Sequence, residues 1–248
     1  SAATPPRRAV IGSGSGGDMG KVAIVVLALL GLAGQGSAAT LEVGAIRGGS
    51  ITTFSWDPNT AGVLYAGVHG GGLYRSSDAG ATWTQIFMPT VAAHFALDVL
   101  ASRHLSGTVF VCEGAPSDAA IWRSTDGAVS FSNVLGITAG TCYAMAEGQT
   151  SGAFYAAMFN GGNTTVHRSS DGGATFTPLT GIIAGGAVTA MIALPNGRLV
   201  AGTRTGGIGT NGSLVYSDND GTSWSTGLAT GGVLGLERSD SGTLIALL

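Results

Sequence analysis

The residues best suited to chemistry in this chain are acidic side chains that recur in similar surroundings. Asp78, Asp126 and Asp171 each follow a serine by two positions and precede an aromatic residue by five, and Asn219 holds the same place in a fourth segment. Two carboxylates that face each other about 5 Å or about 6.5–9.5 Å apart can hydrolyse a glycosidic bond. Equivalent residues of separate repeats would lie too far apart for that. We therefore interpret them as turn formers, because an Asp in a tight turn accepts hydrogen bonds from nearby backbone N–H groups.

The other nucleophilic and metal-ligating side chains follow no pattern of a known site. The histidines have no spacing typical of metal ligands; they are His69, His94, His104 and His167. The chain also lacks a Gly-x-Ser-x-Gly elbow, a phosphate-binding loop and a Cys–His pair. We therefore predict no catalytic residue of these kinds, no metal site and no cofactor.

The acidic turns belong to a repeat that runs through most of the chain. A glycine that precedes an apolar, strand-like run recurs every 45 residues, at Gly62, Gly107, Gly152, Gly197 and Gly242. Each unit holds four strand-like runs, and a four-stranded antiparallel unit of about 45 residues is typical of a β-propeller blade. We predict an all-β propeller with blades at about residues 50–90, 91–137, 138–182 and 183–230 and a partial blade at 231–248.

About 4.5 blades are therefore expected, and these do not make a closed ring. We expect an open arc in which the flank of the first blade and the last strand are exposed. We also expect the natural protein to continue for two or more blades.

The turn between the third and fourth strands of each unit carries the most specific motif. It reads Ser-x-Asp-x-Gly-x-Thr followed by an aromatic residue. The second copy moves the glycine one place to Gly127, and the fourth has Asn in place of Asp. This motif resembles the Asp box of the bacterial neuraminidase repeat family, found in sialidases, some glucanases, sortilin-like receptors and photosystem II assembly factors. The resemblance covers residues 40–248 and implies structural roles for Ser76, Asp78, Gly80, Trp83, Ser124, Asp126, Phe131, Ser169, Asp171, Gly173, Phe176, Ser217, Asn219, Gly221 and Trp224.

A functional site would lie on the face of the propeller away from these boxes. In the sialidases that the chain resembles, the active site lies on the face formed by the loops between second and third strands. We predict Arg47, Glu113, Asp118 and Arg204 as ligand-face candidates there. A sialidase of that family also needs three arginines, an Arg-Ile-Pro motif and a Tyr–Glu pair. The set cannot be completed here, since Arg47 lies in Ile-Arg-Gly without the proline.

The N-terminal part of the chain has the features of an export signal. We interpret residues 1–18 as a non-native upstream segment and residues 19–39 as a signal peptide, with a positive start, an apolar run and the small residues Ser37-Ala38-Ala39 before the cleavage site. The apolar run of 11 residues is shorter than the ~20 that a membrane span needs. We therefore expect a secreted or periplasmic protein, with no stable membrane insertion of the mature chain.

The charge of the mature chain also limits its partners. Residues 40–248 contain 8 arginines, 13 acidic residues and no lysine, and so carry a net charge of −5. Such a surface cannot easily neutralise phosphates, which makes nucleic acid an improbable partner.

Two cysteines lie in the part of the chain that we expect to be exported. Cys112 lies in the second strand of the second blade, and Cys142 opens the first strand of the third. They form either a disulfide between adjacent blades or two buried thiols.

We consider two functions. The first is a secreted, non-catalytic propeller that binds a protein or glycan. The alternative is a glycoside hydrolase of sialidase or glucanase type, with its catalytic set partly beyond Leu248.

Overall fold

A computed structural model describes residues 49–87, 95–114, 118–138, 140–205, 211–238 and 243–247. The predicted upstream segment, the predicted signal peptide, Arg47 and His94 lie outside these residues. The described part contains strands and turns and no helix. It accordingly contains no helix that is long and apolar enough to cross a membrane.

The strands form four antiparallel, four-stranded blades and one two-stranded unit. In each blade the strands follow one another in chain order. Blade 1 comprises β1 (Ile51–Trp56), β2 (Leu64–Val68), β3 (Gly72–Ser76) and β4 (Thr84–Phe87); blade 2 comprises β5 (Phe95–Ala101), β6 (Val109–Gly114), β7 (Asp118–Ser124) and β8 (Ser132–Thr138); blade 3 comprises β9 (Thr141–Glu147), β10 (Phe154–Asn160), β11 (Asn163–Ser169) and β12 (Thr177–Ala184); blade 4 comprises β13 (Ala187–Ala193), β14 (Leu199–Arg204), β15 (Asn211–Ser217) and β16 (Ser225–Gly231); the partial blade comprises β17 (Gly235–Arg238) and β18 (Leu244–Leu247).

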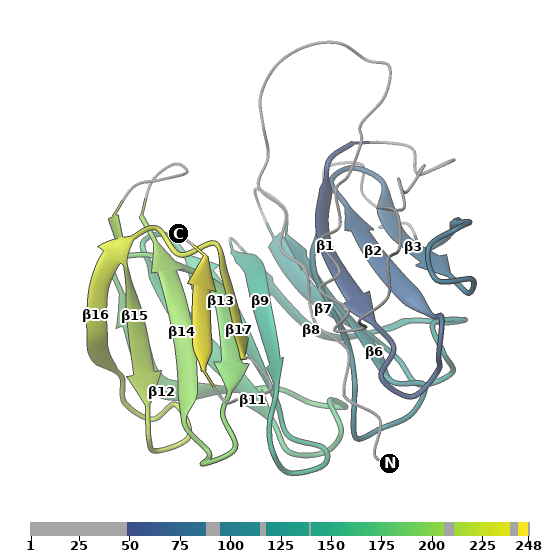
Figure 1. Ribbon diagram of the computed structural model, residues 1–248. Coiled ribbons are helices and arrows are strands. Elements are labelled where there is room, and N and C mark those ends of the chain that lie inside the picture. Colours follow the sequence, from purple (N-terminus) through teal and green to yellow (C-terminus); the bar gives the residue numbers. More distant parts are fainter. Residues whose placement is uncertain are drawn as a thin grey trace.

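The blades stand side by side around an open arc, from blade 1 on the right of Figure 1 to blade 4 and β17 on the left. The first strands β1, β5, β9, β13 and β17 contact one another in succession and form the inner side of the arc. A single bridge between Gly114 and Thr141 also joins β6 to β9, so blades 2 and 3 share one continuous sheet. This arrangement confirms the predicted incomplete all-β propeller.

The expectation of an exposed flank is wrong for blade 1. On β2, Tyr65 points toward blade 2, so Leu64, Ala66 and Val68 point to the other side. All three side chains are buried.

The core is divided into clusters that lie between neighbouring blades. In blades 1 to 3 an aromatic residue of the second strand packs against the next blade, and the 45-residue period gives Tyr65, Phe110 and Tyr155 this role. Each is at most 5% exposed. Because each blade buries one face on its neighbour, the repeat is held together by contacts between units.

A β-bulge recurs in the first strand of every complete blade. The register slips by one residue at Thr52, Leu97, Tyr143 and Thr189. A bulge bends its strand and re-aims the side chains beside it. The residues that follow the bulges are buried, and one of them is Asp98.

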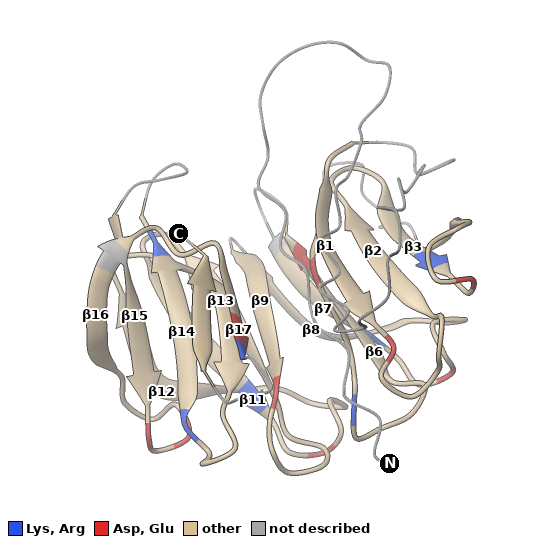
Figure 2. Ribbon diagram, viewed as in Figure 1, with Lys and Arg blue, Asp and Glu red and all other residues tan. Residues whose placement is uncertain are grey.

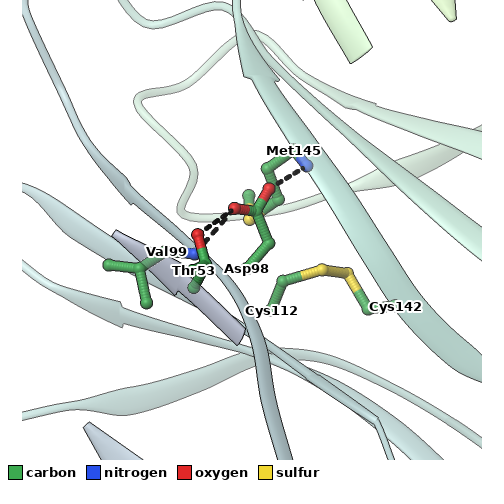
Figure 3. The surroundings of a disulfide bond; sticks show 6 residues. All are labelled: Thr53, Asp98, Val99, Cys112, Cys142 and Met145. Atoms are coloured by element: carbon green, nitrogen blue, oxygen red, sulfur yellow. Dashed lines mark hydrogen bonds between the residues drawn. A yellow bond between two sulfur atoms is a disulfide. The ribbon is translucent and has the colours of Figure 1, made fainter. Parts of the chain in front are cut away.

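Asp98 joins the first strands of three blades. Its carboxylate accepts hydrogen bonds from the Thr53 hydroxyl in blade 1 at 3.2 Å, from its neighbour Val99 N–H at 2.8 Å, and from Met145 N–H in blade 3 at 2.8 Å. Figure 3 shows this network beside the Cys112–Cys142 disulfide. A buried carboxylate with several donors is a strong tie between the elements that supply them.

The two cysteines form a disulfide with Cα atoms 5.4 Å apart. The bond links β6 of blade 2 to β9 of blade 3, close to the Gly114–Thr141 bridge. Of the two alternatives that the sequence leaves open, the structure contains the disulfide.

Candidate functional site

The first predicted box turn holds its own carboxylate inside the turn. Asp78 accepts hydrogen bonds from the Ser76 hydroxyl at 2.7 Å and from Thr82 N–H at 2.8 Å, and it also accepts one from the Thr82 hydroxyl. The Ser76 hydroxyl oxygen in turn accepts from Gly80 N–H at 2.8 Å. The Thr82 hydroxyl, followed by Thr82 N–H and Ser76, lowers the pKa of Asp78 to about 2. The side chain therefore stays ionised and stabilises its turn.

The second and third turns repeat this network. Asp126 accepts from Ser124 and Ser130, and Asp171 accepts from Ser169 and Thr175. These bonds, led by the hydroxyls of Ser130 and Thr175, hold the pKa of both carboxyls well below the usual range.

Two of the four boxes depart from the motif, and in both the hydrogen bonds or the backbone conformation of the turn are kept. In the fourth turn Asn219 accepts from Ser217 and from Ser223 N–H, and its amide donates to the Ser223 hydroxyl at 2.7 Å. In the second turn Ala128 takes the left-handed backbone conformation of the missing glycine, with φ 68° against 93° at Gly80.

The predicted ligand-face residues do not form one cluster in the described part of the chain. Glu113, at the end of β6, is 1% exposed and accepts a hydrogen bond from Trp122 Nε1. Asp118 begins β7, and its side chain lies outside the description. Arg204 ends β14, two blades away from Glu113.

A hollow with polar walls lies on the opposite face, which we call the box face because it carries the box turns and the turns between first and second strands. This cleft between blades 3 and 4 has a volume of about 360 Å³. One wall is the turn after β9, including Gln149 and Thr150, and the other is the fourth box turn, residues 217–224. Tyr155 and Arg168 of blade 3 also line it.

The cleft is open because the repeat changes at this place. The turn after the first strand has the same backbone hydrogen bond in blades 1 to 3, accepted by the carbonyls of Thr60, Leu105 and Thr150. In blade 2, Leu105 packs on the core between blades 2 and 3. In blade 3, the shorter and exposed Thr150 takes its place.

The cleft wall of the fourth box also differs from the other boxes. Asp220 stands where the third box has Gly172, and it adopts a left-handed φ of 61°. Its carboxylate forms an ion pair with Arg168 at 2.8 Å and accepts a hydrogen bond from the Tyr155 hydroxyl. Asp218 is paired with Arg198, with two contacts at 2.6 and 2.9 Å. Figure 2 shows acidic and basic residues together at the turns below β14 and β15.

These pairs define the walls of the cleft. Asp220 is held by Arg168 and Asp218 by Arg198, so each acid of the cleft has a basic partner. Glycoside hydrolysis commonly uses two carboxyl groups that face each other across the scissile bond. The ion pairs instead give the cleft polar walls whose side chains are held in place.

Sequence reasoning missed this cleft, although a signal was present. The prediction used what the repeats share, whereas the cleft forms where they differ. Thr150 and Leu105 hold equivalent positions of neighbouring repeats, as do Asp220 and Gly172, and each pair is separated by close to 45 residues. Comparing the two members of each pair identifies both walls of the cleft.

No protein-family model matches the chain, and no curated protein matches its sequence. Solved structures share its fold. YCF48 bound to D1 peptide superposes with a TM-score of 0.57 and 16% identity, over 81% of this chain and 60% of that one. The GH74 xyloglucanase from Xanthomonas campestris gives a TM-score of 0.55 and 18% identity, over 71% of this chain and 29% of that one.

The Dos1 propeller is similar at a TM-score of 0.56 and 10% identity, over 79% of this chain and 65% of that one. The chain thus spans less than two thirds of each of these three structures. Together these similarities establish the β-propeller fold of the chain.

Proposed function

We propose that this chain is a secreted, non-catalytic β-propeller that binds a protein or glycan. The observation that carries the proposal is the state of its carboxylates. Asp218 and Asp220 in the cleft are paired with arginines, and Glu113 is buried against Trp122. The box acids bond within their own turns. In the described part of the chain, these acids serve the fold and do not form a hydrolytic pair.

A protein partner is supported by one of the similar structures, since YCF48 is bound to a peptide in it. The acidic, lysine-free mature surface disfavours nucleic acid. Loops between second and third strands vary in length among the blades, as expected of segments that are free to carry recognition.

Secretion is supported by two independent features. Residues 19–39 have the pattern of a cleaved export signal. Disulfides such as Cys112–Cys142 persist mainly in oxidising compartments, which include the periplasm and the extracellular space.

A second candidate is a glycoside hydrolase. It is favoured by the similarity to GH74 enzymes, one of which is the xyloglucanase and another an ancestral GH74 enzyme at a TM-score of 0.56 and 20% identity. In that case Glu113 is the carboxylate on the predicted ligand face that would take part.

Turnover of fluorogenic sialosides and β-glucans separates the two candidates. We expect no release of the fluorophore by the folded wild-type protein. Release that is lost in Glu113→Gln, with the thermal unfolding temperature unchanged, would establish the hydrolase and overturn the proposal.

A further inference from the structure

We infer that the cleft between blades 3 and 4 on the box face binds a neutral saccharide of one or two sugar rings. This inference rests on the proposed binding function and assigns it a place and a ligand class. The site differs from the predicted ligand face, which lies at the other end of the blades.

The departures from the repeat converge on one hollow. In the turn after the first strand, Arg103 and Leu105 of blade 2 are replaced by Gly148 and Thr150 in blade 3. In blade 2, Arg103 lies against blade 3, where its guanidinium donates to Gly148 O at 2.8 Å. Both replacements leave less side-chain volume at the interface between blades 3 and 4. The resulting space of about 360 Å³ is within the range of small-molecule sites, about 300–1,000 Å³.

The charges at the cleft are paired. Arg168 in the lining pairs with Asp220, and Asp218 in the lining pairs with Arg198, which lies outside the lining. Phosphate or sialate groups would meet the two carboxylates, and a cationic ligand would meet the Arg168 guanidinium. A neutral ligand avoids both repulsions.

The cleft also has side chains that can form hydrogen bonds with a ligand. Asn196 accepts from Arg198 N–H through Oδ1, and Gln149 donates to Ala193 O through Nε2. Within the described structure, each amide thus uses one atom for the fold, and its other atom remains for a ligand. The Thr150 hydroxyl also lines the cleft. Side-chain amides and hydroxyls both donate and accept, and carboxylates accept, so together they are complementary to the hydroxyl groups of a sugar.

The rest of the lining suits the other side of a sugar ring. It includes the small residues Ala153, Ala193 and Gly197 and the largely buried Tyr155. Small apolar groups leave a shallow surface on which the C–H face of a pyranose can lie. A few polar groups above an apolar floor are the usual composition of small-molecule sites.

The test uses the whole exported chain and four neutral disaccharides at millimolar concentration: cellobiose, maltose, lactose and mannobiose. Thr150→Leu refills the cleft as Leu105 fills the space one blade earlier, and Thr150→Ser keeps both the space and the hydroxyl. Thr60→Leu is the matched control, because Thr60 is exposed and accepts the same turn hydrogen bond in blade 1. The readouts are the saccharide-induced rise in unfolding temperature and the shifts of the Ala153 and Ala193 amide signals by NMR.

We expect at least one disaccharide to raise the unfolding temperature and to shift both amide signals in wild type, Thr150→Ser and Thr60→Leu. Both effects should be lost in Thr150→Leu. Saccharide binding that persists in Thr150→Leu would overturn this site and leave the proposed binding function intact. Binding of none of the disaccharides, or displacement of the same amide signals by peptides alone, would also overturn the inference.

Discussion

Phe110 of blade 2 and Gly173 of blade 3 approach so closely that a Cβ atom on residue 173 would lie 2.2 Å from the Phe110 ring. Gly173 also has a φ of 83°, a backbone conformation that favours glycine. The box turn of one blade is therefore fitted to the second strand of the blade before it.

Gly173→Ala should destabilise the protein by about 2–4 kcal/mol, because the new methyl group clashes with a buried ring and the backbone is strained. Gly127→Ala is the matched control, since its φ is 74° and no atom lies within 4 Å of the added Cβ. It should cost only the backbone strain, about 1 kcal/mol. Chemical denaturation measures both changes, and equal effects would show that the contact with Phe110 is unimportant.

Acid should weaken the box turns in a predictable window. Hydrogen bonds depress the pKa values of Asp78, Asp126 and Asp171 in the folded state below the ordinary value of 3.8. Their contribution to stability is therefore complete above about pH 4 and is lost as pH falls through the folded pKa values. Asp126→Asn should make the unfolding temperature fall less steeply between about pH 4 and pH 2 than in wild type. An unchanged slope would contradict the assigned role of these carboxylates.

Replacing the Asp98 carboxylate by an amide should destabilise the protein. In Asp98→Asn, only one oxygen remains, and the NH₂ group would face a backbone N–H donor such as that of Met145. The loss should be about 3 kcal/mol in the free energy of unfolding. Asp57→Asn is a suitable control, because among the described residues Asp57 accepts a local turn bond, from Asn59 N–H through one oxygen. If the free energy of unfolding falls by less than about 1 kcal/mol in both variants, the hydrogen bonds of Asp98 to the three blades contribute little to stability.

Removing the disulfide should loosen the contact between blades 2 and 3. The bond closes a segment with a sequence separation of 30 residues. Chain entropy alone then gives a loss of about 3–4 kcal/mol for the Cys112→Ala, Cys142→Ala double variant. Thermal and chemical denaturation measure this loss. A double variant as stable as the oxidised wild type would contradict the prediction.

The same bond provides a check on secretion. Protein recovered from the extracellular or periplasmic fraction of the source cell should begin at Thr40 and contain no free thiol. Intact-mass measurement before and after thiol alkylation tests both points. Recovery from the cytoplasm, with residues 19–39 still attached and both thiols alkylated, would contradict secretion.

The 45-residue period was sufficient to predict the blades, the strand order and the turns. It succeeds because each strand is bounded by turn residues whose preferences are local, as Ser169 and Asp171 illustrate in the third box. The replacement of glycine by Ala128 does not disturb the turn, since the neighbouring bonds fix its backbone.

Features that depend on contacts between blades could not be predicted in this way. The sequence places Glu113 on the ligand face, yet every residue of β6 is buried and Glu113 meets Trp122 of the neighbouring strand. The role of Asp98 likewise depends on a bulge and on donors from residues about 45 positions away in each direction. Such tertiary partners have no local signal in the sequence.

Native mass spectrometry of the protein, incubated for hours with neutral oligosaccharides and with peptides, tests the central claim most directly. One spectrum reports both whether a ligand is bound and whether it is still whole. The account predicts a complex that carries the mass of the intact ligand, with no shortened product in solution. Accumulation of cleaved saccharide, or the absence of any complex, would contradict a propeller that binds without catalysis.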